Sequence, residues 1–185
     1  VTGLIKDRNN GSADEASIED ILRIHPKHYV DAFRAASDAG GGELGMRTPF
    51  GAGGVEQAAL AAGLAKRAVA DVMAGNGRKA YSLSRPPGHH CLPDFPNGFC
   101  LLANIAIALE AARVNAPDLK VAILDWDVHH GNGSEAIYLD RADTLTISIH
   151  QERNYPLDTG DADVRCMGQL NIIIPPPPAG GQHNY

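Results

Sequence analysis

The sequence lacks the features of several broad classes of protein. It has only three cysteines, Cys91, Cys100 and Cys166, and no Cys-x-x-Cys pair, which argues against a disulfide framework and for a reducing compartment. No run of Lys or Arg exceeds two residues, so no nucleic-acid surface is indicated. No apolar run reaches the roughly 18 residues of a transmembrane helix. We therefore expect a cytoplasmic protein with no direct nucleic-acid partner and no membrane partner.

The composition is that of an ordinary globular domain. The 185 residues are 44% hydrophobic and 21% charged, with a formal net charge of −6. This acidic balance would suit a cationic substrate, although many cytosolic proteins are equally acidic. The chain begins at Val1 without an initiating Met and ends at Tyr185 without a closing element. We expect residues 1–185 to form a single domain that is truncated at both ends.

The hydrophobic pattern predicts alternating helices and strands. Helices are expected at 16–36 (two short helices broken near Pro26), 55–74, 101–115 and 133–139. Strands are expected at 79–83, 120–125, 144–149 and 169–174, and a Gly-rich loop at 40–54. The alternation is typical of an open, mostly parallel α/β sheet with helices on both faces. Ligands of such sheets bind at the carboxyl ends of the strands, where the polar motifs of this chain lie.

The first polar motif is DWDVHHGNG, from Asp125 to Gly133. Residues two apart on a strand point the same way, so Asp127 and His129 can aim at one point as metal ligands, with Asp125 one step earlier on the same face. Zinc suits this mixture of oxygen and nitrogen donors, although the spacing does not exclude Mn or Fe. The alternative is a solvated turn, but so many Asp and His residues at one strand end favour a metal site.

The second motif is RPPGHH, from Arg85 to His90, which follows the strand expected at 79–83. Histidine is the natural acid or base near neutral pH, and two adjacent imidazoles disfavour each other's charge. His89 and His90 could therefore take different roles in catalysis. The alternative interpretation is a pair of surface histidines.

Weaker signals lie outside these two motifs. In Asn97-Gly98-Phe99-Cys100 the segment either enters a buried helix or presents Phe99 to a pocket. His150 ends a predicted strand, as either a functional residue or a satisfied polar side chain. The remaining histidines are interpreted as structural or solvated: His25, His28 and His183.

Taken together, the motifs resemble the histone deacetylase and acetylpolyamine amidohydrolase family. RPPGHH, NGFC, DWDVHHGNG and TISIH occur in the family's order, and the resemblance runs from about Ile18 to Tyr185. Trp126 and Asn132 look like the class II and bacterial branch. The resemblance implies the arginase/deacetylase fold and a zinc-dependent amidohydrolase, which converts an N-acetyl amide of acetyl-lysine or acetylpolyamine to acetate and an amine.

The resemblance also implies a role for each residue of the two motifs. Asp127 and His129 would bind one zinc ion. His89 and His90 would be the tandem active-site histidines, one a general base for the zinc-bound water and the other a general acid or electrostatic partner. Asp125 would hydrogen-bond to His89 and orient it.

Further residues receive supporting roles from the same resemblance. His130 and Asn132 would lie behind the zinc ligands and the catalytic histidines. Gly98, Phe99 and Tyr155 would line the substrate tunnel, with Phe99 and Tyr155 on opposite walls. A structural potassium ion would be surrounded by Asp125, Asp127, His129, Ser148 and Ile149.

Two elements of the family's pattern are missing from the sequence. A second Asp ligand and an oxyanion-stabilising Tyr or His lie well downstream in the family. The contexts of Asp158, Asp161, Asp163 and Tyr185 do not match those positions. We therefore expect the full-length protein to be an enzyme and the 185-residue chain alone to be inactive. Polyamine-type members are often dimers, which leaves a homo-oligomer open, but no dimer element is visible.

Two other classes of function remain as alternatives. The chain could be a catalytically incomplete fragment or a non-enzymatic metal-binding scaffold of the same fold. It could also be another metallohydrolase, but arginase-like enzymes use two manganese ions and Asp-x-His-x-Asp clusters, whereas this chain has Asp-x-Asp-x-His-His. Metallophosphoesterases need a Gly-Asn-His-Glu segment, and Gly131-Asn132-Gly133-Ser134 is not one. The zinc amidohydrolase is the preferred hypothesis.

Overall fold

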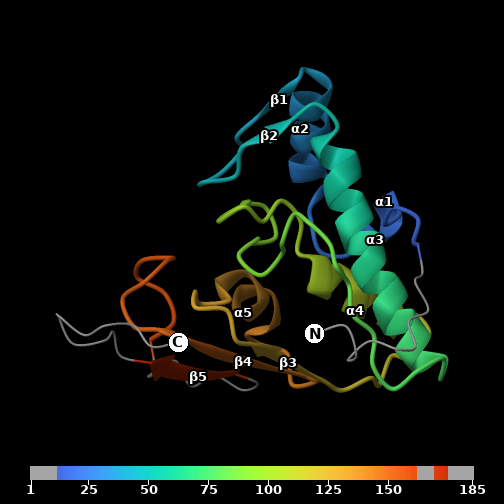
Figure 1. Ribbon diagram of the computed structural model, residues 1–185, viewed down its shortest axis with the longest axis vertical. Coiled ribbons are helices and arrows are strands. Elements are labelled where there is room, and N and C mark those ends of the chain that lie inside the picture. The colour runs from blue at the N-terminus through green and yellow to red at the C-terminus, as the bar shows by residue number, and fades with distance from the viewer. Residues whose placement is uncertain (1–11, 162–168, 175–185) are drawn as a thin grey trace, which may run out of the picture.

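The computed structural model describes residues 12–161 and 169–174, with helices stacked on one side of a small sheet (Figure 1). The elements follow one another as α1 (Ile18–Leu22), α2 (Lys27–Asp38), β1 (Gly41–Gly42), β2 (Phe50–Gly51), α3 (Gly54–Met73), α4 (Asn104–Arg113), β3 (Val121–Asp125), α5 (Asn132–Tyr138), β4 (Thr144–Gln151) and β5 (Gln169–Ile174). None of the helices in this part of the chain has the length and apolarity needed to cross a membrane.

Strands β3, β4 and β5 form a parallel sheet in that order. The register pairs Asp125 with Ser148, and Ser148 with Asn171. The strands predicted at 120–125, 144–149 and 169–174 are therefore confirmed, as is the parallel α/β arrangement. Because parallel strands end at the same edge of a sheet, the polar residues that follow β3 and β4 are brought together.

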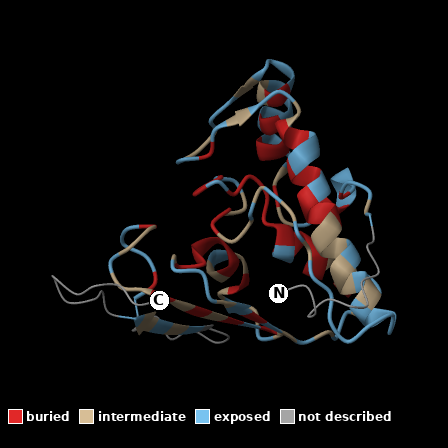
Figure 2. Cartoon of the chain, in the orientation of Figure 1, coloured by how far each residue is buried: buried red, intermediate tan, exposed pale blue. Residues whose placement is uncertain are grey.

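Two apolar clusters hold the helices to one another and to the sheet. Small alanines let α3 and α4 pack closely, and the first half of α3 is buried in this contact (Figure 2). Figure 2 also shows the second half of α3 as more exposed. The cluster that joins α4 and α5 to the sheet consists of Cys91, Cys100, Ala103, Ala106, Leu109, Ile123 and Tyr138. The helices predicted at 16–36, 55–74, 101–115 and 133–139 are thus confirmed, with boundaries shifted by a few residues.

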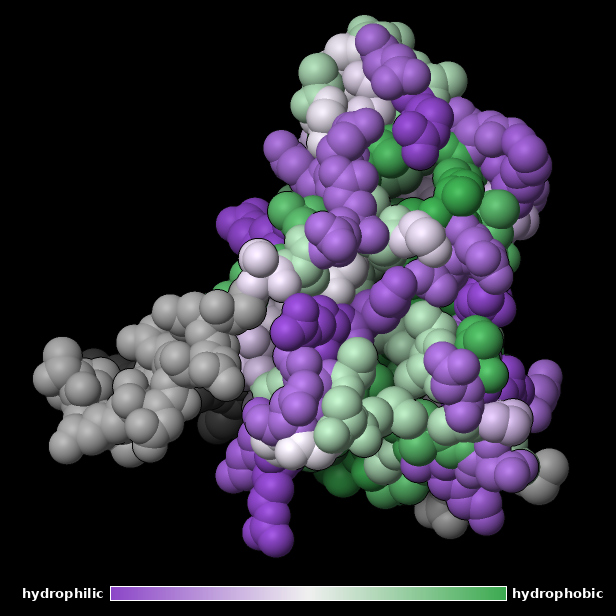
Figure 3. Space-filling view, turned by 90° about the vertical axis from the view of Figure 1, so that its right-hand side faces the viewer, coloured by the Kyte–Doolittle hydropathy of each residue, from purple (hydrophilic) through white to green (hydrophobic). Residues whose placement is uncertain are grey.

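The sheet is covered by helices on one face only in the described residues. The opposite face carries large apolar side chains that remain 40–52% exposed: Leu124, Leu145, Leu170, Ile172 and Ile174. Parallel sheets are normally covered on both faces, and the helices expected on this second face do not occur among the described residues. The surface on the side of the molecule that carries α3 differs from this apolar sheet face, because hydrophilic side chains there alternate with hydrophobic ones (Figure 3).

Two sequence predictions about local structure are wrong. Residues 79–83 are not a strand: no described residue pairs with them, and Tyr81 and Leu83 are 85% and 83% exposed. Strand-forming residues alone do not make a strand, because the backbone needs a hydrogen-bonded neighbour. The loop expected at 40–54 instead contains the short antiparallel pair β1–β2. Gly41, with φ 114°, permits this pairing, because a side chain there would overlap the Phe50 carbonyl.

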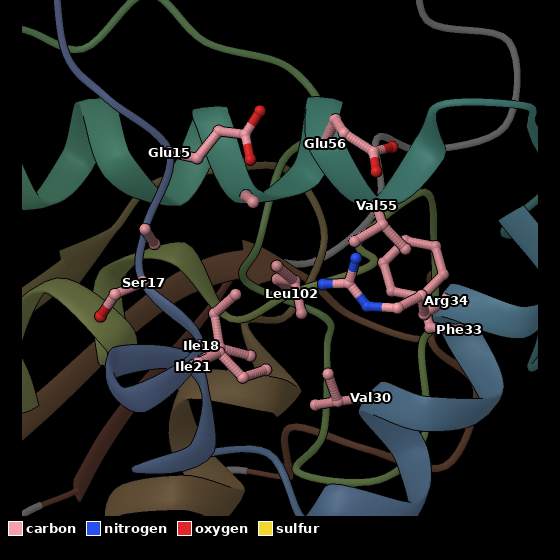
Figure 4. Close-up of a pocket in the computed structure, with 12 residues that line it drawn as sticks. Glu15, Ser17, Ile18, Ile21, Val30, Phe33, Arg34, Val55, Glu56 and Leu102 are labelled. Carbon is pink, nitrogen blue, oxygen red and sulfur yellow. The ribbon is translucent and has the colours of Figure 1, made fainter. Parts of the chain in front are cut away.

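A cavity of about 290 Å³ lies between α1, α2 and α3, away from the polar motifs. Its walls are mainly apolar, among them Ile21, Val30 and Leu102, with Glu15, Arg34 and Glu56 among the charged residues that line it (Figure 4). None of the predicted site residues lines this cavity.

His25 is a structural residue that ties the α1–α2 corner to the loop carrying the second motif. Its Nδ1–H donates to the Pro93 carbonyl at 2.7 Å, and its Nε2 accepts the Ala103 backbone N–H at 3.0 Å. Burial lowers the pKa of His25 to about 4. The structural interpretation of His25 is therefore confirmed. His28 lies exposed on α2, and His183 is outside the described residues.

We expect His25 to make the protein less stable in mild acid. Its folded-state pKa of about 4 lies below the unfolded value of 6.5. Between these values the unfolded chain binds a proton that the folded chain does not, so stability is complete above about pH 6.5 and falls as the pH drops toward 4. The decrease in the free energy of unfolding should approach roughly 3 kcal/mol. Urea unfolding at several pH values between 7 and 4.5 measures it.

His25→Asn keeps a side-chain donor for Pro93 but removes the titration. The free energy of unfolding of this variant should depend less steeply on pH than that of the wild type. The matched control is His28→Asn, because His28 is exposed and should leave the slope unchanged. Equal slopes in the wild type and His25→Asn would show that His25 does not carry the effect.

Candidate active site

Three loops converge at the carboxyl edge of the sheet and bring the predicted site residues together. The His89 carbonyl accepts the backbone N–H groups of Gly133 and Ser134 at 2.8 and 3.2 Å, which joins the second motif to the start of α5. The Gln151 N–H donates to the Val128 carbonyl at 3.0 Å, which joins the end of β4 to the loop after β3. The convergence therefore rests on backbone bonds, which fix the side chains that the loops carry.

Asp127 and His129 lie beyond the end of β3, which ends at Asp125 as expected, so strand alternation is not what places their side chains together. The Asp125 carboxylate accepts the Asp127 N–H at 3.0 Å, and the Asp127 carboxylate accepts the His129 N–H at 2.8 Å. These side-chain acceptors turn the backbone out of the ladder immediately after the strand. The turns still place the two side chains together, with His129 Nδ1 3.2 Å from Asp127 Oδ1.

The pair Asp127 and His129 fits part of a zinc site. Two ligands that each lie about 2.0–2.2 Å from a tetrahedral zinc are roughly 3.3 Å apart, close to the separation in this pair. The side chains are 48% and 38% exposed, so both donors are open to solvent. No group of three or more His, Cys, Asp or Glu that could hold a metal occurs among the described residues. The described part of the chain thus supplies two donors of the three that zinc usually takes from a protein.

His89 and His90 stand beside this pair and have different partners. His89 Nδ1–H donates to Asp125 Oδ2 at 2.8 Å, as the family resemblance implies. His90 Nδ1–H donates to Asn132 Oδ1 at 2.9 Å. Their ring centroids are 3.8 Å apart, and the His90 ring centroid is 6.0 Å from that of His129. Because Nδ1–H is the donor in each of these bonds, the Nε2 atom of His90 or His89 can accept a proton whenever that ring is neutral.

The two imidazoles lie in different electrostatic surroundings. Burial, followed by the neighbouring His89, lowers the pKa of His90 to about 4, so His90 is neutral at pH 7. Burial alone would raise the pKa of Asp125, but the hydrogen bond from His89 holds it below its ordinary value. His89 therefore lies against a carboxylate, whereas His90 lies against a neutral amide.

Gly98 and Tyr155 form a wall next to the histidines. The Tyr155 ring is nearly perpendicular to the rings of His90 and His129, with centroids 5.1 and 5.8 Å away. The Tyr155 hydroxyl donates to Asn97 Oδ1. A Cβ on Gly98 would approach His90 Cδ2 to 2.5 Å, so only glycine fits. The structure does not bring Phe99 into ring contact with these residues; its side chain is 62% exposed.

A buried polar network lies beneath the loop after β3. The Gly131 N–H donates to Ser148 Oγ at 3.3 Å, the Ser148 hydroxyl donates to His150 Nδ1 at 2.9 Å, and His150 Nε2–H donates to the Gly160 carbonyl at 3.0 Å. His150 is therefore buried with both ring nitrogens hydrogen-bonded, which agrees with the interpretation of a satisfied polar side chain. Ser148 keeps one lone pair, and it lies beside Asp125 in the sheet. The potassium site expected around Asp125, Asp127, His129, Ser148 and Ile149 remains a prediction.

Sequence reasoning missed Glu135, Asn171 and Arg47. Glu135 Oε2 lies 2.7 Å from His130 Nε2 and accepts the Asn171 side-chain amide at 3.3 Å, so it fixes the buried His130 behind His129. A glutamate in the first turn of a short helix gives no sequence signal for such a partner. The Arg47 guanidinium lies over the Tyr155 ring, 5.2 Å from its centroid. That contact depends on tertiary structure alone.

Known proteins resemble this chain along its whole length. The sequence profile described as "Histone deacetylase domain" matches residues 1–185. The "Histone deacetylase-like amidohydrolase" of Pseudomonas aeruginosa is 50% identical over 190 residues, which cover 100% of this chain and 50% of the relative. A "Probable deacetylase" of Archaeoglobus fulgidus is 37% identical, over 92% of this chain and 48% of the relative.

A solved structure resembles the chain in three dimensions. The crystal structure of the HDA15 HD domain matches with a TM-score of 0.82 and 33% sequence identity, covering 88% of this chain and 48% of that one. The chain thus spans about half the length of the relatives it matches.

Proposed function

The chain belongs to the histone deacetylase domain family, and we propose that the full-length protein is a zinc-dependent deacetylase. Its reaction would hydrolyse the N-acetyl amide of acetyl-lysine or acetylpolyamine to acetate and an amine. The observation that carries this proposal is the Asp127–His129 pair at metal-ligand separation, with the His89–Asp125 and His90–Asn132 pairs beside it. The names of the relatives, deacetylase and amidohydrolase, support the same class of reaction.

Asp127 and His129 would hold the zinc ion, with a third protein ligand from outside the described residues. Bound zinc would lower the pKa of a coordinated water toward about 7 and polarise the acetyl carbonyl. We further propose that the loop after β3 keeps both donors in place, because each carboxylate in it caps the next backbone amide. The network through Ser148 and His150 supports that loop from below.

The two histidines would divide the proton transfers between them. His90 is the imidazole nearer to His129, and its neutral Nε2 suits it to take the proton of the attacking water. His89 donates its Nδ1–H to the Asp125 carboxylate, which suits it to act as the acid or electrostatic member of the pair. Tyr155 and Gly98 would restrict the acetyl group to the space beside His90 and His129.

A catalytically incomplete fragment or non-enzymatic metal-binding scaffold is the second candidate. It is favoured by one observation, namely that only two suitable metal donors come together in the described residues. The relatives are about twice as long as this chain. A third ligand beyond the chain would therefore reconcile the incomplete set with an active full-length enzyme.

The cellular setting is proposed from the cysteines and the charge. Cys91 and Cys100 are buried free thiols, and burial raises the pKa of Cys100 to about 12. Unpaired thiols of this kind suit a reducing compartment, and we propose a cytoplasmic location. The proposed partner is the acetylated substrate, without direct nucleic-acid or membrane binding; the homo-oligomer remains a prediction.

Metal analysis and an acetyl-lysine reporter test the proposed function. The full-length protein should contain one zinc per chain and release acetate from an Nε-acetyl-lysine peptide, and the 185-residue chain alone should do neither efficiently. Chelation should abolish turnover, and added zinc should restore it. Two manganese ions per chain with release of urea would contradict the proposal, as would absence of hydrolysis by the zinc-loaded full-length protein, which would favour the scaffold.

A further inference from the structure

Arg47 is held at the edge of the site by its own backbone. It lies between β1 and β2. Met46 in the same segment forms a β-bridge with Asn97, in the loop that follows the second motif. The Arg47 carbonyl accepts the Phe99 N–H at 2.9 Å, and the Met46 carbonyl accepts the Gly98 N–H at 3.0 Å. The segment is thus attached to the loop that carries Gly98 and Phe99. Movement of Arg47 relative to the site is restricted accordingly.

The Arg47 guanidinium lies next to a wall residue of the site, Tyr155, and has no carboxylate partner among the described residues. It lies over the Tyr155 ring at cation–π distance, 5.2 Å from the centroid, and Tyr155 in turn borders His90 and His129. No ion pair involves Arg47 in residues 12–161 and 169–174. Glu43, in the same segment, instead accepts the Thr48 backbone N–H at 2.8 Å. The hydrogen-bond donors of an exposed guanidinium are therefore available to a ligand.

We propose that Arg47 determines which amine carrier the enzyme accepts, favouring acetyl-lysine in a peptide over an acetylpolyamine. This inference rests on the proposed deacetylase function. In N-acetylputrescine and in acetyl-lysine the same run of methylene groups separates the acetylated nitrogen from the next polar group. That group is a cationic ammonium in the diamine, whereas in the peptide it is the backbone, with carbonyl oxygens that accept hydrogen bonds. A guanidinium at this position binds the carbonyls and repels the ammonium.

The overall charge of the protein does not reverse this local preference. The chain has a formal net charge of −6, which attracts cations in general. However, salt screens charges beyond roughly 8–10 Å, so a group at the mouth of the site interacts mainly with its immediate neighbours. Asp127, an exposed carboxylate close enough to act on His90, would be neutralised by the proposed zinc. Arg47 is a cation that a carrier meets beside Tyr155.

The test compares two substrates in the full-length, zinc-loaded enzyme. The substrates are an Nε-acetyl-lysine tripeptide with uncharged neighbours and N-acetylputrescine. The wild type should prefer the tripeptide. Arg47→Glu should lower kcat/KM for the tripeptide roughly tenfold, mainly through KM, and raise it several-fold for N-acetylputrescine. Arg47→Lys should still disfavour the diamine, because it keeps the charge while losing the planar donor set.

Arg78→Glu is the matched control, because it makes the same change in net charge at an exposed position beyond the end of α3. It should alter neither substrate preference nor zinc content. Equal changes for both substrates in Arg47→Glu, or a wild-type preference for N-acetylputrescine, would overturn the role of Arg47 while leaving deacetylation intact. Failure of the wild type to hydrolyse either substrate would instead overturn the proposed function, and this inference with it.

Discussion

His129→Ala is expected to remove zinc and activity together from the full-length protein. The described chain offers only two converging donors, with His129 Nδ1 3.2 Å from Asp127 Oδ1, so the substitution leaves a single one. The loss of zinc affinity should exceed the roughly 10–100-fold that follows loss of an outer hydrogen-bond partner of a metal ligand. Activity at ordinary zinc concentrations should fall below detection. Metal content after dialysis and turnover of an acetyl-lysine reporter, measured on the same sample, check both expectations.

The control for this substitution is His28→Ala, which removes an exposed histidine of α2. It should keep one zinc and full turnover. His129 is 38% exposed and outside the apolar clusters, so its loss should hardly change the melting temperature of the metal-free protein. Retention of stoichiometric zinc in His129→Ala would contradict the ligand assignment. Loss of zinc without loss of turnover would contradict the metal-dependent reaction itself.

The family and the parallel sheet could be predicted because their signals are local in sequence. The strand at 120–125 is a short apolar run, and the motif from Asp125 to Gly133 follows it directly. The structural similarity at TM-score 0.82 confirms the fold class, and the family match confirms the family. The hydrogen bond between Asp125 and His89 is implied by the family resemblance, and it is present in the structure.

The features that were missed leave no signal in the hydrophobic periodicity of the sequence. Residues 79–83 have a strand-like composition, yet no described segment pairs with them, and a strand is defined by its pairing. Strand alternation was used to bring Asp127 and His129 together, but side-chain bonds to backbone amides two residues further on do this instead. Arg47 contacts Tyr155 only after the segment between β1 and β2 folds against the loop that carries Asn97. No periodicity or motif signals such a contact.

His90→Ala is expected to keep zinc but to lower kcat by at least about 10²-fold, the usual scale for loss of a general acid or base. His90 approaches the proposed zinc ligand His129 only through its ring, with centroids 6.0 Å apart, and its Nδ1–H is bonded to Asn132 rather than to Asp127 or His129. The metal donors therefore stay in place when the imidazole is removed. KM should change little, because the proton transfer belongs to the transition state rather than to substrate binding.

His90 is also buried, so the alanine variant leaves a space beside Gly98 and Tyr155 and could lose rate through repacking. His90→Asn separates the two causes, since its amide can still donate to Asn132 but cannot take a proton from water. If proton transfer is what His90 supplies, both variants should be equally slow while the asparagine variant is the more stable in thermal unfolding. Recovery of turnover in His90→Asn would identify a packing role. Near-normal turnover in both variants, together with an inactive His89→Ala, would show that His89 is the base and that the two histidines are assigned the wrong way round.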